Sequence, residues 1–214
     1  MDDTLYDEIA FVKSGFRAVA EYFLPNDSDT MFETMMAVLE NEGRGKVFDA
    51  TLTHFGLGTK CNIKKALNIY RTHTPKISLN DDALEIVAYY GALKIPLYLV
   101  TDGNKIVQAN KIKALGLQNY VKKSLITHRY GIINAKPSTY CFEKIAHFEA
   151  VEYKEIVYIG DNNNKDFVGI KKLGFQTIRI RQGMFKSVQK DAAFQAHKEI
   201  DSLRELKQLL KVKM

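Results

Sequence analysis

Short apolar runs alternate with helical patterns over the second half of this chain, and that alternation constrains the fold more than any other feature. Four apolar runs occur, at residues 96–100, 124–126, 156–160 and 177–180. A helical pattern follows each of the first three, after Asn104, over about 138–147 and as far as Leu173. Alternating strands and helices place successive strands parallel to one another. The order predicts an α/β fold with a doubly wound parallel sheet.

The first third of the chain has a different pattern. Apolar residues recur at helical spacing from about Asp7 to Phe23, and further helical patterns cover about 29–40, 47–55 and 63–70. These segments are separated by glycine-containing turns. We therefore predict an all-helical domain over residues 13–79, inserted into an α/β core made of residues 1–12 and 80–214.

Composition excludes several classes of protein. The chain has 214 residues, of which 46% are hydrophobic and 26% charged, as in an ordinary globular protein. It lacks the ~18 to 20 residue apolar run of a membrane span, and acidic residues stand where a signal peptide would be basic. We expect a cytoplasmic protein without a membrane partner. The two cysteines, Cys61 and Cys141, have no metal-ligand spacing and are expected to be free thiols.

The net charge of +6 does not by itself indicate nucleic-acid binding. The lysines are scattered over many segments rather than clustered on one. A small anionic substrate is favoured over nucleic acid, and the oligomeric state is left open.

Polar residues gather directly after the predicted strands. Thr101, Asp102 and Gly103 follow one apolar run, Asp161 and its acidic loop follow another, and Lys136 lies in a loop ahead of a helix. Ligands bind at the carboxyl ends of the strands in such sheets. Any one of these residues has an ordinary structural explanation, since Asp-Gly is common in turns and an aspartate often caps a helix. Their order along the chain makes the group informative.

Four motifs together resemble those of the haloacid dehalogenase (HAD) superfamily. That family has a D-x-D-x-T loop, a strand ending in Ser or Thr, a lysine, and an acidic G-D-x-x-x-x-D loop. The matching positions in this chain, in the correct order, are Asp2 with Thr4, then Thr101, then Lys136, then Asp161 with Asp166. The predicted helical insert also resembles the helical cap of this family.

The resemblance implies a Mg²⁺ site and a proton-transfer group. Asp2 would be the general acid/base, with its backbone carbonyl on the metal. Asp161 would be a direct metal ligand, and Asp166 would lie in the metal shell or orient the lysine. A carboxylate-held Mg²⁺ is what phosphoryl transfer requires.

The resemblance also implies a phosphate-binding set. Thr4, Thr101 and the amide of Asp102 or Gly103 would donate hydrogen bonds to the phosphate. Lys136 would pair with the phosphate and with the nucleophile. Three residues are thus expected to be catalytic, namely Asp2, Lys136 and Thr101.

The family nucleophile would stand two positions ahead of Asp2, and the sequence begins at Met1. Moving the motif to start at Asp2 or at Asp3 places Thr4 or Leu5 at the acid position, so neither register restores it. The apolar strand expected before the motif is also absent. We therefore expect the functional protein to be longer at its N-terminus, and the chain as it stands to be inactive.

The leading hypothesis is a Mg²⁺-dependent phosphatase of a small phosphorylated metabolite, acting through an aspartyl-phosphate. The helical cap would select the substrate, and its candidate contacts are Arg17, Arg44, Tyr70, Arg71 and His73. A catalytically dead binding or regulatory protein of the same fold is the alternative, as is a phosphomutase. A phospho-receiver domain ranks last, because the expected phosphoacceptor does not follow a middle strand.

Overall fold

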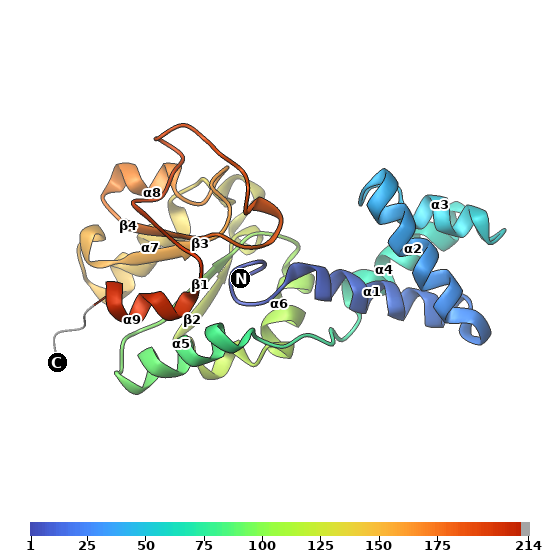
Figure 1. Cartoon of the computed structure of the whole chain (residues 1–214), viewed down its shortest axis with the longest axis horizontal. Coiled ribbons are helices and arrows are strands. Elements are labelled where there is room, and N and C mark those ends of the chain that lie inside the picture. The colour runs from blue at the N-terminus through green and yellow to red at the C-terminus, as the bar shows by residue number, and fades with distance from the viewer. Residues whose placement is uncertain (211–214) are drawn as a thin grey trace. The chain divides into compact units, whose positions relative to one another are not determined.

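The computed structural model describes residues 1–210 and divides the chain into two compact units (Figure 1). One unit combines Met1–Glu8 with the chain from Ser78 onward, and the other is Ile9–Ile77. The predicted junctions, at 12/13 and 79/80, lie within four residues of these. The last residues of the predicted core, 211–214, lie outside the described residues.

Ile9–Ile77 is helical, apart from turns and the linker that leads back to the α/β unit. Its helices are α1 (Glu8–Phe23, of which Glu8 belongs to the other unit), α2 (Ser28–Glu42), α3 (Val47–His54) and α4 (Lys60–Thr72). The apolar stripes of these helices meet in one cluster that includes Phe16, Val19, Met31, Met35 and Leu52. All four helices occur where the periodicity predicts them. The amphipathic pattern was sufficient because each helix buries a single stripe.

The described part of the α/β unit holds five parallel strands. They are β1 (Tyr98–Thr101), β2 (Lys123–Ile126), β3 (Val157–Gly160), β4 (Gln176–Ile180) and β5 (Lys198–Ile200). The first four coincide with the predicted apolar runs. Strand β5 was not predicted, because a three-residue Lys-Glu-Ile strand carries neither an apolar run nor a clear alternation.

The predicted parallel strands with helices on both faces are present, but among the described residues these strands do not form one sheet. They form two separate sheets, β1-β2 and β3-β4-β5. The segment Met1–Tyr6 makes a tight turn, in which the Leu5 amide donates to the Met1 carbonyl at 2.9 Å, and it adds only an isolated bridge between Asp2 and Tyr6. Apolar runs reveal strands, but they do not reveal which strands are hydrogen-bonded neighbours.

Helices cover both faces of these sheets. Helices α5 (Asp81–Ala92) and α9 (Leu206–Leu209) share one cluster with side chains of β3, β4 and β5. Helices α7 (Tyr140–Glu149) and α8 (Val168–Leu173) share another with β1, β2 and β3. In β3, Val157 and Ile159 belong to the first cluster and Tyr158 to the second, because alternate residues of a strand face opposite sides. Helix α6 (Lys105–Ala114) follows β1 (Figure 1).

No helix among residues 1–210 is long and apolar enough to cross a membrane. Both cysteines are free, Cys61 exposed and Cys141 buried, as predicted.

Candidate active site

The N-terminal turn lies against the carboxyl end of β3. The Thr4 hydroxyl is 3.0 Å from Oδ1 of Asp161 and 3.2 Å from the Asp2 carbonyl oxygen. Thr4 is buried, and its own carbonyl accepts a hydrogen bond from Gln182 Nε2 at 3.0 Å. Residues more than 150 positions apart are therefore adjacent, and the first and last predicted motifs meet.

The Asp2 carboxylate is held by two groups. Its Oδ1 accepts from Lys111 Nζ at 2.8 Å and also from the Tyr6 hydroxyl. Burial alone would raise the pKa of Asp2, but the charge and hydrogen bond of Lys111, with the hydrogen bond of Tyr6, lower it. The burial of Tyr6 and the negative charge of Asp2 raise the pKa of the Tyr6 hydroxyl. Asp2 is therefore a carboxylate, and Tyr6 is the donor.

Lys111 was not predicted from the sequence. It lies within α6 and only 3% of its surface is exposed, although a lysine in a helix is usually solvated. A lysine among the polar residues of a helix gives no local sign that it will be buried against a carboxylate more than one hundred residues away. The pairing comes from the tertiary fold.

Lys136 forms a second buried charge cluster. Its Nζ is 2.7 Å from Asp166 Oδ1 and donates to the Tyr158 hydroxyl at 3.0 Å. Burial would lower the pKa of Lys136, but the negative charge of Asp166 and the electrostatic interaction with Tyr158 hold that pKa well above its ordinary value. Lys136 is therefore a fixed cation at the end of β3.

Asp161 and Asp166 bring two buried carboxylates together. Burial, and then the charge of Asp166, raise the pKa of Asp161 to about 6. The Asp166 carboxylate lies close to the backbone of Gly160, where a Cβ atom would be only 2.4 Å from Asp166 Oδ2. The Asn162 amide donates to that same oxygen at 3.1 Å. Glycine is therefore required directly before Asp161.

These residues fit a magnesium ion. Burial raises the pKa of Asp161 most, and the charge of Asp166 raises it further, so two carboxylates interact in a buried place; Mg²⁺ binds through one or two carboxylates while keeping several waters. The Asp2 carbonyl oxygen, 3.2 Å from the Thr4 hydroxyl that also contacts Asp161, is a further oxygen donor nearby. No cluster of three or more His, Cys, Asp or Glu side chains suited to a metal occurs over residues 1–210. Carboxylate and carbonyl oxygens are the kind of ligand that suits a hydrated Mg²⁺ ion.

The Thr101 loop serves the fold as well as the site. The buried Thr101 hydroxyl donates to Gln108 Oε1 at 3.1 Å. Gly103 has a φ of +131°, and a Cβ there would be 2.8 Å from Gln108 Nε2. Gln108 thus supports the turn that follows β1.

The Asp102 side chain ties three loops together. Its Oδ1 accepts from the Thr127 hydroxyl at 2.9 Å and from the Lys136 amide at 3.1 Å, and its Oδ2 pairs with Lys165 Nζ at 2.7 Å. The pKa of Asp102 is lowered because the charge of Lys136 and the bonds from Lys165 and the Lys136 amide outweigh burial. Both oxygens of the Asp102 carboxylate are therefore occupied by contacts within the protein. The group of Asp102 that the family resemblance assigns to phosphate binding is its backbone amide, not this carboxylate.

Three of the candidate substrate contacts, Tyr70, His73 and Arg17, interact with other residues of the helical unit. Tyr70 packs edge-on against Phe11, with ring centroids 5.4 Å apart, and His73 Nδ1 is 2.8 Å from the Tyr70 carbonyl oxygen. Arg17 pairs with Asp29 and stacks over the Phe32 ring, 4.2 Å from its centroid. Arg17, Tyr70 and His73 are all partly exposed, whereas the other two candidates, Arg44 and Arg71, are exposed.

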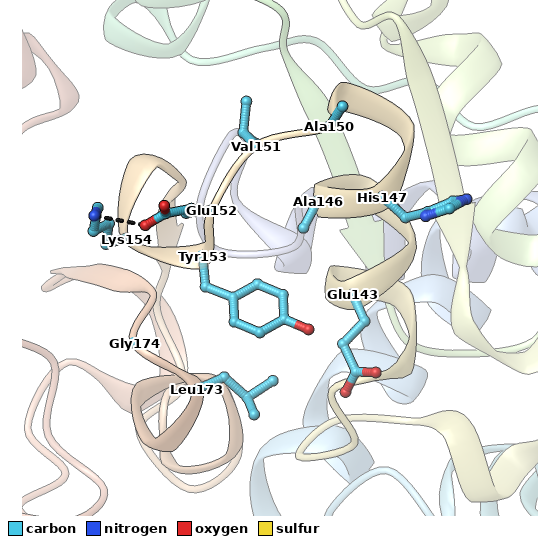
Figure 2. Close-up of a pocket in the computed structure, with 10 residues that line it drawn as sticks. All are labelled: Glu143, Ala146, His147, Ala150, Val151, Glu152, Tyr153, Lys154, Leu173 and Gly174. Carbon is cyan, nitrogen blue, oxygen red and sulfur yellow. Dashed lines mark ion pairs between the residues drawn. The ribbon is translucent and has the colours of Figure 1, made fainter.

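A pocket of about 810 Å³ lies elsewhere on the α/β unit (Figure 2). It is formed by α7, the turn after it and the end of α8, and Figure 2 shows Tyr153 within it and the ion pair of Lys154 with Glu152 at its side. It contains none of the predicted site residues. This pocket and the predicted site are therefore separate places on the α/β unit.

Comparison with known proteins gives one matching family model. The model of the haloacid dehalogenase-like hydrolases matches residues 1–180. Among curated proteins, the glyceraldehyde 3-phosphate phosphatase of Methanocaldococcus jannaschii is 28% identical over 99% of this chain and 94% of its own length. The enzyme of the same name from Pyrococcus furiosus is 26% identical over 99% and 90%. A phosphoglycolate phosphatase of Neisseria meningitidis is 30% identical, over 45% of this chain and 40% of its own.

Solved structures show the same fold. A HAD-hydrolase, YfnB, from Bacillus subtilis, bound to magnesium, is 21% identical with a TM-score of 0.68, over 99% of this chain and 96% of that one. A HAD phosphatase from Thermococcus onnurineus is 23% identical with a TM-score of 0.62, over 99% and 95%. These likenesses extend over both units of the chain.

Proposed function

This chain belongs to the haloacid dehalogenase-like hydrolase family, and on that premise we propose that it is a Mg²⁺-dependent phosphatase of a small phosphorylated metabolite. One observation carries the proposal: Lys136, Asp161 and Asp166 are buried together beside the turn that holds Asp2 and Thr4. Charges that repel and lose hydration gather in this way where a ligand requires them.

The phosphate would be bound by a fixed cation and hydrogen-bond donors. Lys136 supplies the charge, while the hydroxyls of Thr4 and Thr101 and the amides of Asp102 and Gly103 supply hydrogen bonds. Asp161, the Asp2 carbonyl and Asp166 would hold Mg²⁺, which when bound neutralises phosphate oxygens. Because these groups are held by buried contacts before the substrate arrives, they need little reorganisation during reaction.

Asp2 would be the proton-transfer group. The carboxylate form favoured by Lys111 and Tyr6 is the form that accepts a proton from an attacking water. The covalent aspartyl-phosphate route implied by the family needs a second carboxylate two positions ahead of Asp2, which is not a position of this sequence. The residues described thus account for binding and proton transfer, while the covalent step depends on that group.

The substrate we propose is a three-carbon or similarly small phosphomonoester. Relatives that match over nearly all of this chain are named glyceraldehyde 3-phosphate phosphatases, and the shorter match is named a phosphoglycolate phosphatase. The helical unit, residues 9–77, would act as the cap that selects among them.

The test is phosphate release from glyceraldehyde 3-phosphate, phosphoglycolate and a sugar phosphate, with and without Mg²⁺. The chain as it stands is compared with a version extended by an apolar strand that places Asp two positions ahead of Asp2. We expect release by the extended form only, and its loss on Lys136→Met. Failure of the folded extended form on every ester would contradict the proposal.

A second candidate is a non-catalytic binding protein of the same fold. It is favoured by the pairing of all three site aspartates within the protein, Asp2 with Lys111, Asp161 with Thr4 and Asp166 with Lys136. A protein of this kind would bind inorganic phosphate and Mg²⁺, measured by calorimetry, without turnover in either form. A phosphomutase would instead transfer the group to a sugar phosphate, which product analysis distinguishes.

A further inference from the structure

Asp3, the neighbour of the proposed acid/base, lies in a region of the backbone that favours glycine. Its φ is +47°, a left-handed conformation that aspartate and asparagine tolerate better than most residues. Its Oδ1 accepts from the amide of Glu8, the first residue of α1, at 2.9 Å. Its Oδ2 accepts from the amide of Met184 at 3.1 Å. Both carboxylate oxygens of Asp3 therefore accept hydrogen bonds from backbone amides, one at the start of α1 and one in the loop that contains Met184.

The loop that contains Met184 is built to receive Asp3. Gly183 has a φ of +65°, and a Cβ there would lie 2.2 Å from Asp3 Cγ. Next to it, Gln182 donates from Nε2 to the Thr4 carbonyl at 3.0 Å. The loop thus touches two successive residues of the turn, and a side chain at position 183 would displace it.

The same loop is anchored to the sheet and to the acidic loop. The buried Arg179 of β4 donates from its guanidinium to the carbonyls of Phe185, at 2.6 Å, and Lys186, at 3.2 Å. The fully buried Asn163 donates from Nδ2 to the Val188 carbonyl at 3.1 Å. The loop after β4 is therefore held in place, and its contacts with Asp3 and Thr4 hold the N-terminal turn in place as well.

We propose that Asp3, clamped against Gly183 and Met184, is the positioning residue that sets the place of Asp2 and Thr4 relative to Asp161. This rests on the proposed function, since it assigns Asp3 to the same site. Asp3 does not act on substrate. It acts through the turn, so that the Thr4 hydroxyl lies within hydrogen-bond distance of both Asp161 Oδ1 and the Asp2 carbonyl oxygen.

Amide hydrogen exchange tests the clamp without any ligand. In Asp3→Gly, which keeps the left-handed backbone but removes both acceptors, we expect the Glu8 and Met184 amides to exchange at least ~10-fold faster. The Leu5 amide, which closes the turn onto Met1, should also lose protection. Asp3→Asn retains one acceptor oxygen and should be intermediate, a rescue that general unfolding would not produce.

Mg²⁺ affinity measured by calorimetry tests the consequence. We expect Asp3→Gly to weaken it ~10-fold, as loss of an outer-shell partner does. The exposed Asp7→Asn should leave it unchanged. The matched glycine pair is Gly183→Ala against Gly116→Ala, because Gly116 has a similar φ of +63° and its added Cβ would come no nearer than 3.7 Å to Asn119. Only Gly183→Ala should weaken Mg²⁺ binding.

Two results would overturn the proposal. One is wild-type exchange at Glu8 and Met184 in Asp3→Gly. The other is faster exchange at those two amides while the Leu5 amide stays protected, which would leave a clamp that does not position the turn. Neither depends on phosphatase activity, so failure of the proposed function is seen separately, as a folded extended form that binds no Mg²⁺ and hydrolyses no ester.

Discussion

The two units of this protein bury very different kinds of side chain. In Ile9–Ile77, all of which the structure describes, Thr51 is the one fully buried polar residue. The described part of the α/β unit buries eleven, including Lys111, Asp161, Asp166 and Arg179. Buried charge costs stability unless it is paired. The core of the helical unit is therefore almost entirely apolar, whereas the α/β unit buries several charged side chains, among them Asp161 directly after β3.

The largest expected effect comes from breaking a buried ion pair of the α/β unit. Lys136→Met leaves Asp166, whose side chain is 2% exposed, without its cation, and should lower the free energy of unfolding by ~3 to 5 kcal/mol. Lys154→Met is the matched control, because Lys154 pairs with Glu152 while both side chains are 70% exposed. Urea denaturation followed by circular dichroism measures both. Equal losses of stability in Lys136→Met and Lys154→Met would contradict the expectation that the buried ion pair matters more than the exposed one.

A cavity in the helical unit should cost nearly as much but leave the site intact. Leu52 is fully buried, so Leu52→Ala should lower the free energy of unfolding by ~2 to 5 kcal/mol through lost packing. Ile9→Ala, at a side chain 40% exposed, serves as the control and should cost far less. Mg²⁺ affinity should stay unchanged in both variants. A weaker Mg²⁺ site in Leu52→Ala would show that the units are not independent.

Removing one repelling charge should stabilise the protein without Mg²⁺. The raised pKa of Asp161 means that its contribution to stability is complete below about pH 4 and lost as the pH rises through about 6. Asp161→Asn should therefore gain ~2 kcal/mol over wild type at pH 7.5 in chelator and nothing at pH 4.

Added Mg²⁺ should reverse that order at pH 7.5, because it stabilises only the wild type. Thermal melts at both pH values, with Asp7→Asn as the exposed control, give the measurement. A variant less stable than wild type in chelator at pH 7.5 would contradict the interpretation of a repelling carboxylate pair.

The smallest effect on stability is expected at Arg17. Its pair with Asp29 is largely exposed, so Arg17→Ala should change the free energy of unfolding by less than ~1 kcal/mol. If Arg17 contacts substrate, KM in the extended enzyme rises while kcat holds. Asp29→Ala breaks the same ion pair but keeps the cation, and should leave KM unchanged. A KM that rises equally in both would assign the effect to the ion pair rather than to the charge of Arg17.

Local patterns predicted most of the elements. The apolar stripe of α1 and the runs of β1 and β3 are short-range features, read within a few residues. The polar residues after those runs, Thr101 and Asp161, were singled out because ligands bind at the carboxyl ends of parallel strands. The short polar strand β5 and the division into two sheets had no such signal.

The sequence by itself determined the order of strands and helices and the chemical groups that follow each strand, because those follow from the side chains of neighbouring residues. Only the tertiary structure decided the partners: Lys111 for Asp2, Lys165 for Asp102, and Gly183 with Met184 for Asp3. Each pair joins residues 60 or more positions apart, where spacing along the chain carries no information on distance. Asp2 and Asp3 are neighbours along the chain, but the Asp2 carboxylate accepts from the side chains of Lys111 and Tyr6, whereas the Asp3 carboxylate accepts from two backbone amides.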